Sequence, residues 1–422
     1  MKAKKIILKN GLRVITVPMK ESPTVTALVL VETGSKYETK EINGLSHFLE
    51  HMCFKGTIKR PTSRDISTEL DTMGAQYNAF TGQEYTGYYA KSDTKHFKNI
   101  FDVVSDIYLN STFPEAEMQK EKGVIIEEIN MYEDQPMRHV QDLIMEVMYG
   151  DQPAGWSIAG PIENIKKMKR DDFVKYKKEQ YVPKATTVII AGGIKEKDMM
   201  NEVKKAFGSL KNDKKTGKIK TIEKQSAPQA LIKHKVTDQT HFVLGFRSLN
   251  VFDKKSTILS VLAGVLGAGM SSRLFHKLRE EMGVCYYVRA NTDPYTDHGV
   301  FQISSGVDNK RVKEVITAIL KECEKLKDEL ISEKELVKVK EMFISGMKMG
   351  LEATDDIANF YGGQEVMVGK IESPEEKIKK IKAVTTKQVR DMARLVFQDD
   401  KINLALIGPF SKKEEFLPIL KV

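Results

Sequence analysis

Cysteine is scarce in this chain, which excludes a small secreted scaffold held together by disulfides. Only Cys53, Cys285 and Cys323 occur among 422 residues, and none is spaced like a metal ligand relative to another cysteine or histidine. An odd, sparse set of thiols is typical of reduced cysteines in the cytosol. We therefore expect a cytoplasmic protein and assign no metal site to the cysteines.

Long apolar runs are also missing. No stretch approaches the roughly 18 residues of a transmembrane helix, so we expect no membrane partner. The first residues, MKAKKIILKNG, are basic and lead directly into an alternating pattern typical of a strand. They lack the apolar centre of a secretory signal and are too few for a usual transit peptide. The sequence leaves open whether a targeting segment was removed from a precursor.

Neither sign of charge dominates. The chain has 67 basic and 58 acidic residues, a formal net charge of +9, and is 41% hydrophobic and 30% charged. These proportions are typical of a globular protein with sizeable cores. The lysines are spread along the chain and no nucleic-acid motif is present, so we expect no nucleic-acid partner.

The order of strands and helices recurs after about 210 residues, which predicts two similar halves. The corresponding segments are 25–31 and 241–246, 75–80 and 286–290, 85–90 and 300–304, 95–109 and 309–326, and 187–191 and 402–407. Because strands come in adjacent runs between long helices, we expect the α+β class with mainly antiparallel sheets rather than a doubly wound parallel sheet. We place a first domain at 1–210, a charged linker at 211–228 and a second domain at 229–422.

The segment HFLEH at 47–51 places two imidazoles and a carboxylate within one helical turn. A helix advances about 100° per residue, so His51 lies about 40° from His47, and Glu50 about 60° to the other side. Neutral imidazoles hold Zn²⁺ and leave a position for water, and a nearby carboxylate accepts the proton when that water attacks a carbonyl. We predict that His47 and His51 bind zinc and that Glu50 is the general base, in the HxxEH order that inverts the HExxH motif.

The surroundings of this motif favour a helix with one buried face. Asn43 is a suitable N-cap and Gly56 a suitable stop. Leu45, Leu49 and Met52 fall on the side opposite the histidines, where they would pack on a core. The alternative is a pair of ordinary helical histidines beside a solvated glutamate.

A tetrahedral catalytic site needs a third protein ligand, and a second predicted helix supplies candidates. Glu121 and Glu128 are seven residues apart, so they share a helix face within about 20°, together with Val124 and Ile125. Glu127 points about 120° away from Glu121 and is expected to be solvated. We predict Glu128 as the third ligand and Glu121 as a carboxylate that supports a ligand or handles protons. The alternative is an ordinary charged surface helix.

The sequence closely resembles the pitrilysin and insulinase group of inverted-motif zinc peptidases. The segments that carry the resemblance are HFLEHMCFKGT at 47–57, EKGVIIEEI at 121–129 and KNGLRV at 9–14. Within this group the chain is similar to the processing-peptidase branch, related to the catalytic subunit of the mitochondrial processing peptidase. The resemblance implies that each half is an α/β roll and that only the first binds metal. It implies one Zn²⁺ per chain on His47, His51 and Glu128, with Glu50 as base and Glu121 as a catalytically important carboxylate.

The resemblance also assigns a role to the second half. Family members with a complete site carry an Arg and a Tyr seven residues apart near the scissile peptide, and Arg279 and Tyr286 match this pattern. A guanidinium and a phenol suit the binding of a peptide carbonyl or its oxyanion. Without the family, an ordinary surface Arg and a strand Tyr would be the simpler interpretation.

The resemblance further implies an assembly. In larger relatives the metal and the Arg–Tyr pair come from different halves of a four-domain clamshell, so a two-domain chain needs two copies to build it. We expect a homodimer whose site is completed in trans, and a heterodimer with a related chain stays open.

The segment AQYNAFT at 75–81 resembles the family's substrate-binding edge strand, with Asn78, Ala79 and Phe80 as substrate-binding residues. An edge strand can bind an extended peptide through main-chain hydrogen bonds. The alternative is a hairpin strand that ends in a turn at Thr81-Gly82.

These observations predict a zinc endopeptidase that cleaves peptides or unfolded N-terminal extensions inside a dimeric chamber. The alternative is a structural or assembly subunit that keeps the fold without activity. The sequence does not specify the natural substrate or the cleavage-site preference.

Overall fold

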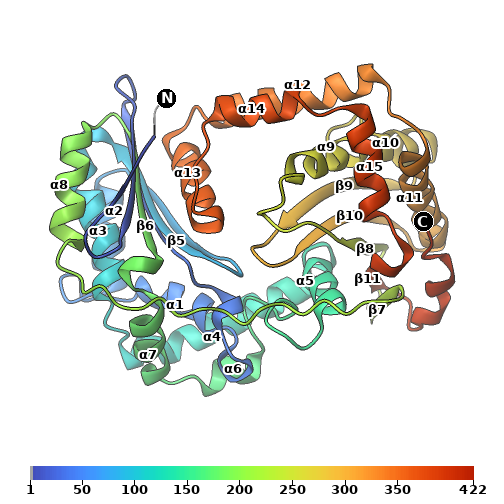
Figure 1. Ribbon diagram of the computed structural model, residues 1–422. Helices are drawn as coiled ribbons and strands as arrows, with labels where there is room; N and C mark the ends of the chain where they lie inside the picture. The colour runs from blue at the N-terminus through green and yellow to red at the C-terminus, as the bar shows by residue number, and fades with distance from the viewer. Residues whose placement is uncertain (1–2) are drawn as a thin grey trace. The chain divides into compact units, whose positions relative to one another are not determined.

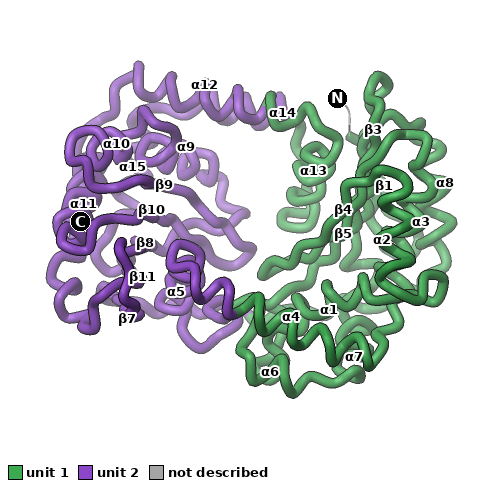
Figure 2. Tube along the Cα trace, turned by 180° about the vertical axis from the view of Figure 1, so that it is seen from behind, with its two compact units in different colours: residues 1–129, 157–219, 348–373 green, residues 130–156, 220–347, 374–422 purple. Residues whose placement is uncertain are grey.

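The computed structural model describes residues 3–422; Met1 and Lys2, where the predicted first domain begins, lie outside the described residues. The chain forms two compact units, coloured separately in Figure 2. Unit 1 comprises Met1–Ile129, Ser157–Ile219 and Lys348–Ser373, and unit 2 comprises Asn130–Trp156, Lys220–Met347 and Pro374–Val422.

The sheet of unit 1 has the strand order β1-β2-β6-β3-β5-β4. Its pairs are antiparallel except β2 with β6, because the long segment between these two strands brings the chain back in the same direction. The predicted α+β class with mainly antiparallel sheets is confirmed. The strands are β1 (Lys4–Ile7), β2 (Arg13–Pro18), β3 (Thr24–Val31), β4 (Gln76–Thr81), β5 (Thr86–Asp93) and β6 (Thr186–Gly192).

Helices cover both faces of this sheet (Figure 1). One face packs on most of the helices of unit 1, around fully buried side chains such as Phe48, Tyr88 and Phe101. The other face packs on α13 (Thr354–Val368), with Leu28, Ile189 and Tyr361 in the contact. The remaining helices are α1 (Leu45–Cys53), α2 (Ser63–Thr72), α3 (Phe97–Asn110), α4 (Glu115–Asp134), α6 (Ile162–Lys167), α7 (Arg170–Gln180) and α8 (Glu196–Phe207).

Unit 2 repeats this plan with the strand order β7-β11-β8-β10-β9, in which only β7 and β11 are parallel. This order corresponds to β2-β6-β3-β5-β4, so the predicted internal repeat is confirmed. The strands are β7 (Gln229–His234), β8 (Gln239–Arg247), β9 (Cys285–Pro294), β10 (Gly299–Asp308) and β11 (Ile402–Gly408). The helices are α5 (Pro136–Tyr149), α9 (Ser256–Gly267), α10 (Arg273–Phe275), α11 (Val312–Asp328), α12 (Glu333–Gly350), α14 (Pro374–Lys382) and α15 (Thr386–Val396).

Two helices depart from the predicted consecutive domains 1–210 and 229–422. Helix α5 belongs by sequence to the first half, yet it covers a face of the second sheet, where Ile144 and Met148 lie in one buried cluster with Val243. Helix α13 belongs to the second half and covers the first sheet. Each exchange buries an apolar sheet face that would otherwise be exposed, which is a strong driving force.

Two predictions from composition concern the cysteines and the apolar runs. The three cysteines are free and buried. Across residues 3–422, no helix combines the length and the apolar character needed to cross a bilayer.

Candidate metal centre

Helix α1 begins at a specific backbone turn. Its N-cap is Gly44, with φ of 101° and no side-chain cap, so the prediction that Asn43 caps the helix is wrong. A positive φ favours glycine, and a Cβ at Gly44 would lie 2.5 Å from the carbonyl oxygen of Ala159. Glu38 binds the free amides instead: its carboxylate accepts from the Gly44 amide at 2.9 Å and from the Ser46 amide at 2.6 Å. Burial raises the pKa of Glu38 to about 7, although these hydrogen bonds oppose the shift.

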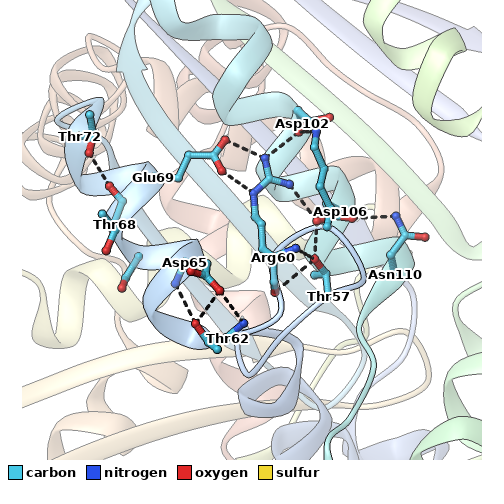
Figure 3. A network of polar contacts seen from close by, with 12 residues as sticks. Thr57, Arg60, Thr62, Asp65, Thr68, Glu69, Thr72, Asp102, Asp106 and Asn110 are labelled. Atoms are coloured by element: carbon cyan, nitrogen blue, oxygen red, sulfur yellow. Dashed lines mark hydrogen bonds and ion pairs between the residues drawn. The ribbon is translucent and has the colours of Figure 1, made fainter.

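A network of ion pairs around the buried Arg60 guanidinium follows the end of α1 (Figure 3). The helix ends at Cys53, before the predicted stop at Gly56, and the chain turns between Thr57 and Arg60. The Arg60 guanidinium donates to Glu69, Asp102 and Asp106, at 2.7 to 2.8 Å.

The hydroxyl of Thr57 also donates to Asp106, at 2.6 Å. The same hydroxyl accepts from the Arg60 amide at 2.8 Å. Because Asp106 lies on α3, the network joins the segment that follows α1 to α3.

The two faces of α1 differ as predicted. Leu45, Leu49 and Met52 are buried in the core of unit 1. The histidine side chains lie on the other side, with 14% of His47 and 20% of His51 exposed. The motif therefore presents partly exposed imidazole rings from a helix that is anchored by its buried face.

Three predicted ligands converge on one point. The Nε2 atoms of His47 and His51 lie 3.8 Å and 3.5 Å from Oε2 of Glu128, and one ligand atom from each residue lies within 4.8 Å of the others. Ligands about 2.1 Å from a tetrahedral ion are separated by about 3.4 Å, so these distances suit one bound ion. Burial and the adjacent His51 lower the pKa of His47 to about 4, so its ring is neutral at pH 7.

Glu121 supports one of these ligands rather than joining them. Its Oε1 accepts from Nδ1 of His51 at 2.9 Å, and its Oε2 is 2.5 Å from Nζ of Lys55. Protonation on Nδ1 leaves Nε2 of His51 with a free lone pair, which a metal ligand requires. Burial raises the pKa of Glu121, but the hydrogen bonds from His51 and Lys55 outweigh burial and lower it overall.

The predicted face of α4 is correct for most residues. Glu121 and Ile125 are buried, and Glu127 is exposed as expected. The prediction that Val124 shares this face is wrong, because 51% of Val124 is exposed. Val124 lies about 60° round the helix from Glu121, which places it beyond the buried stripe.

Glu50 has a partner that the sequence reasoning missed. The hydroxyl of Thr81, the last residue of β4, donates to Oε2 of Glu50 at 2.5 Å. Burial raises the pKa of Glu50, while this hydrogen bond opposes the shift. The alternation of side chains along a strand places Thr81 and Ala79 on the same face of β4. The sequence does not show that this face packs against α1, so it does not predict the contact with Glu50.

The predicted substrate-binding strand, β4, is an edge strand of its sheet. In residues 3–422 β4 pairs with β5 only, so its other edge is open. The Ala79 amide donates to Oδ1 of Asn78 at 2.9 Å, which shows that it points away from β5. Phe80 packs against Tyr85 on the α13 side of the sheet. The structure therefore places the Ala79 main chain at the open edge and the Phe80 ring away from Glu50.

Arg279 and Tyr286 contact each other in unit 2. Arg279 lies in a π-helical turn, His276–Glu281, and Nη1 donates to the carbonyl oxygen of Tyr286 at 2.6 Å. Its guanidinium also lies 4.9 Å from the centre of the Tyr286 ring, and 76% of Tyr286 is exposed. The two side chains therefore contact each other, in a different compact unit from the histidine cluster, and their role near a scissile peptide stays a prediction.

Comparison with protein families gives a direct assignment. Residues 13–162 match the family described as insulinase (peptidase family M16), and residues 167–343 match the peptidase M16 inactive domain. The chain belongs to peptidase family M16. This confirms the resemblance to the insulinase group.

Relatives extend over nearly the whole M16 chain. The uncharacterized zinc protease YmxG of Bacillus subtilis is 37% identical over 96% of this chain and 98% of its own. An uncharacterized zinc protease of Streptomyces coelicolor is 32% identical over 96% of this chain and 90% of its own. A protease from Helicobacter pylori shares the fold, with a TM-score of 0.91 and 23% identity over 97% of this chain and 99% of that chain.

The residues of this M16 chain fit a zinc ion. Two imidazole nitrogens and one carboxylate oxygen form the donor set of a catalytic zinc site, with the fourth position left for water. His47 is neutral at pH 7, so its ring has one nitrogen with a free lone pair, and Glu121 fixes the Nδ1 proton of His51, which leaves Nε2 of that ring free. The roles of Lys55, Glu38 and Thr81 were not predicted from the sequence.

Proposed function

We propose that the chain is a zinc-dependent endopeptidase that cleaves peptides or unfolded N-terminal extensions. The observation that carries this proposal is the convergence of His47, His51 and Glu128 with Glu50 on the same helix turn. The zinc protease names of relatives that match nearly the full chain support it.

Each residue near the site has a task in this chemistry. Bound zinc supplies Lewis acidity, which makes water a better nucleophile and polarises the scissile carbonyl. Glu50 accepts the proton of the attacking water and passes it to the leaving amine. Glu121 and Lys55 hold His51 in the required tautomer and orientation. His47 is neutral and can offer a ring nitrogen to the metal.

The open edge of β4 suits an extended peptide. A residue in an antiparallel strand directs its N–H and C=O to the same side, so the main chain of Ala79 can pair with an added strand. Asn78 must release the Ala79 amide when a peptide binds. Because the pairing uses main-chain atoms, substrates need an extended, unfolded segment rather than a particular side chain.

The Arg279 and Tyr286 pair supports a site completed by a second copy. Both groups are hydrogen-bond donors suited to a peptide carbonyl, and Tyr286 is largely exposed. We place them over the scissile bond of a partner subunit in a dimeric chamber. Mixing inactive Glu50→Gln with inactive Arg279→Ala then restores activity in the mixed dimers. Mixed dimers that form without recovering activity contradict this arrangement.

Cleavage of a quenched peptide library tests the catalytic proposal. Wild type and Glu127→Gln are expected to cleave, because Glu127 is exposed on the same helix as Glu128 and has no task in the site. Glu50→Gln is expected to retain zinc and lose cleavage. Wild-type protein that holds stoichiometric zinc but cleaves nothing in a Glu50-dependent way would favour the assembly subunit instead.

A further inference from the structure

Thr81 links the predicted base to the predicted peptide-binding strand. Its hydroxyl donates to Oε2 of Glu50, and among residues 3–422 no group donates to Oε1. The two carboxylate oxygens of Glu50 are therefore inequivalent: one is held by β4 and the other is available for a proton.

The position of Thr81 within β4 makes this contact informative. Thr81 and Ala79 are two residues apart, so their side chains share the face of β4 that packs toward α1, while the main chain of Ala79 is at the open edge. A peptide that pairs with Ala79 therefore lies two residues along β4 from Thr81, whose hydroxyl donates to Glu50. The strand that binds substrate and the contact that orients the base are thus the same short element.

A tight backbone contact fixes the end of this strand. The amides of Ser35 and Lys36 donate to the carbonyl oxygens of Gly82 and Gln83, at 3.3 Å and 2.9 Å. A Cβ at Gly34 would lie 2.1 Å from the Gly82 oxygen, so only glycine permits this approach. The turn after Thr81 is therefore attached to the segment that leads into α1.

We propose that Thr81 is a positioning residue that holds Oε2 of Glu50, so that Oε1 receives the proton of the attacking water. This role rests on the proposed peptidase function. It differs from a general structural role because it requires a hydroxyl donor at this position rather than a side chain of a given size.

Steady-state kinetics on a quenched peptide separate these roles. Thr81→Val keeps the shape and removes the donor, and it is expected to lower kcat by about 10- to 100-fold, the range for loss of a hydrogen bond to a charged group. KM is expected to stay within about 2-fold, because the Ala79 main chain is unchanged. Thr81→Ser restores the donor and most of kcat. Tyr77→Phe is the matched control, since it removes a hydroxyl bonded to Asp71 from the same face of β4.

Two measurements that do not depend on turnover complete the test. Zinc content is expected to be equal in wild type and Thr81→Val. Binding of the same peptide to Glu50→Gln and to Glu50→Gln with Thr81→Val is expected to be equal by fluorescence anisotropy.

The role of Thr81 is overturned if Thr81→Val keeps wild-type kcat, if its defect lies in KM and peptide binding, or if Thr81→Ser does not restore kcat. Failure of the proposed function is recognised separately, because wild type then shows no Glu50-dependent cleavage and the role of Thr81 is rejected with it.

Discussion

The Arg60 network allows a quantitative test of how α1 is supported. Arg60 is replaced by Met, which keeps much of the apolar stem and removes the guanidinium. Asp106 is replaced by Asn, which removes one buried charge and keeps the shape. The double variant removes both charges. The side chains of Arg60 and Asp106 are 4% and 7% exposed, so the two charges depend on each other for compensation.

The expected magnitudes follow from burial. Glu69 and Asp102 are 38% and 44% exposed, so water solvates them when Arg60 is lost and they contribute little. Asp106 is left as a buried charge that keeps only its Thr57 and Asn110 hydrogen bonds, and Arg60→Met should cost about 3 kcal/mol. Asp106→Asn leaves Arg60 paired with Glu69 and Asp102, and should cost about 1–2 kcal/mol.

The double variant gives the decisive comparison. Because neither charge is left uncompensated, it should lose only about 2 kcal/mol, less than Arg60→Met alone. Hydrogen exchange of α2 and α3 peptides across a urea series measures the loss in unit 1, whereas fluorescence of Trp156 reports on unit 2. If the stability losses of the two single variants add, so that the double variant is less stable than Arg60→Met, then the charges of Arg60 and Asp106 do not compensate each other as argued.

Three further predictions concern the metal centre and its helix. Glu121→Gln should weaken zinc binding by about 10- to 100-fold in competition with a chelator, because His51 loses its charged partner, whereas Glu127→Gln should not. Glu38 has its pKa raised to about 7 in the folded state, so its contribution to stability is present at low pH and lost as pH rises through 7. Relative to Glu38→Gln, the wild-type free energy of unfolding should therefore rise by on the order of 3 kcal/mol from pH 8 to pH 4. If the difference between the two proteins does not change with pH, the raised pKa of Glu38 is wrong. Gly44→Ala should lower the unfolding temperature more than Gly74→Ala, because both have positive φ but only Gly44 lacks room for a Cβ; equal shifts contradict this.

Helical periodicity made much of the metal centre predictable. The spacing of His47, Glu50 and His51 fixes their relative directions once a helix forms, and the same holds for Glu121 and Glu128. The histidines of α1 lie opposite its buried apolar face, so periodicity alone does not show that they meet Glu128 on α4. The resemblance to a peptidase family supplied the pairing of these helices.

Other parts of the site depend on contacts between elements distant in sequence. Thr81 is 31 residues from Glu50, and its role depends on how β4 docks against α1. The cap of α1 was assigned to Asn43 from residue preference, but the turn needs a positive φ, which Gly44 provides and Glu38 completes. These contacts leave no periodic pattern in the sequence.

The exchange of α5 and α13 has a similar cause. An amphipathic pattern shows that a helix packs on an apolar surface, but it does not show which of two similar sheets provides that surface. The repeat made both sheets suitable partners, so the consecutive domains 1–210 and 229–422 were the simplest assignment. Packing, rather than chain order, decides the composition of each unit.

Zinc content of the purified wild type and two variants tests the central claim most directly. Each protein is equilibrated with zinc, desalted and analysed by mass spectrometry of the metal. We predict one zinc per chain in wild type and in Glu127→Gln, and little or none in Glu128→Gln, because Glu128, unlike Glu127, shares the coordination point with His47 and His51. Wild-type protein that retains no zinc, or Glu128→Gln that retains as much as Glu127→Gln, would contradict the account.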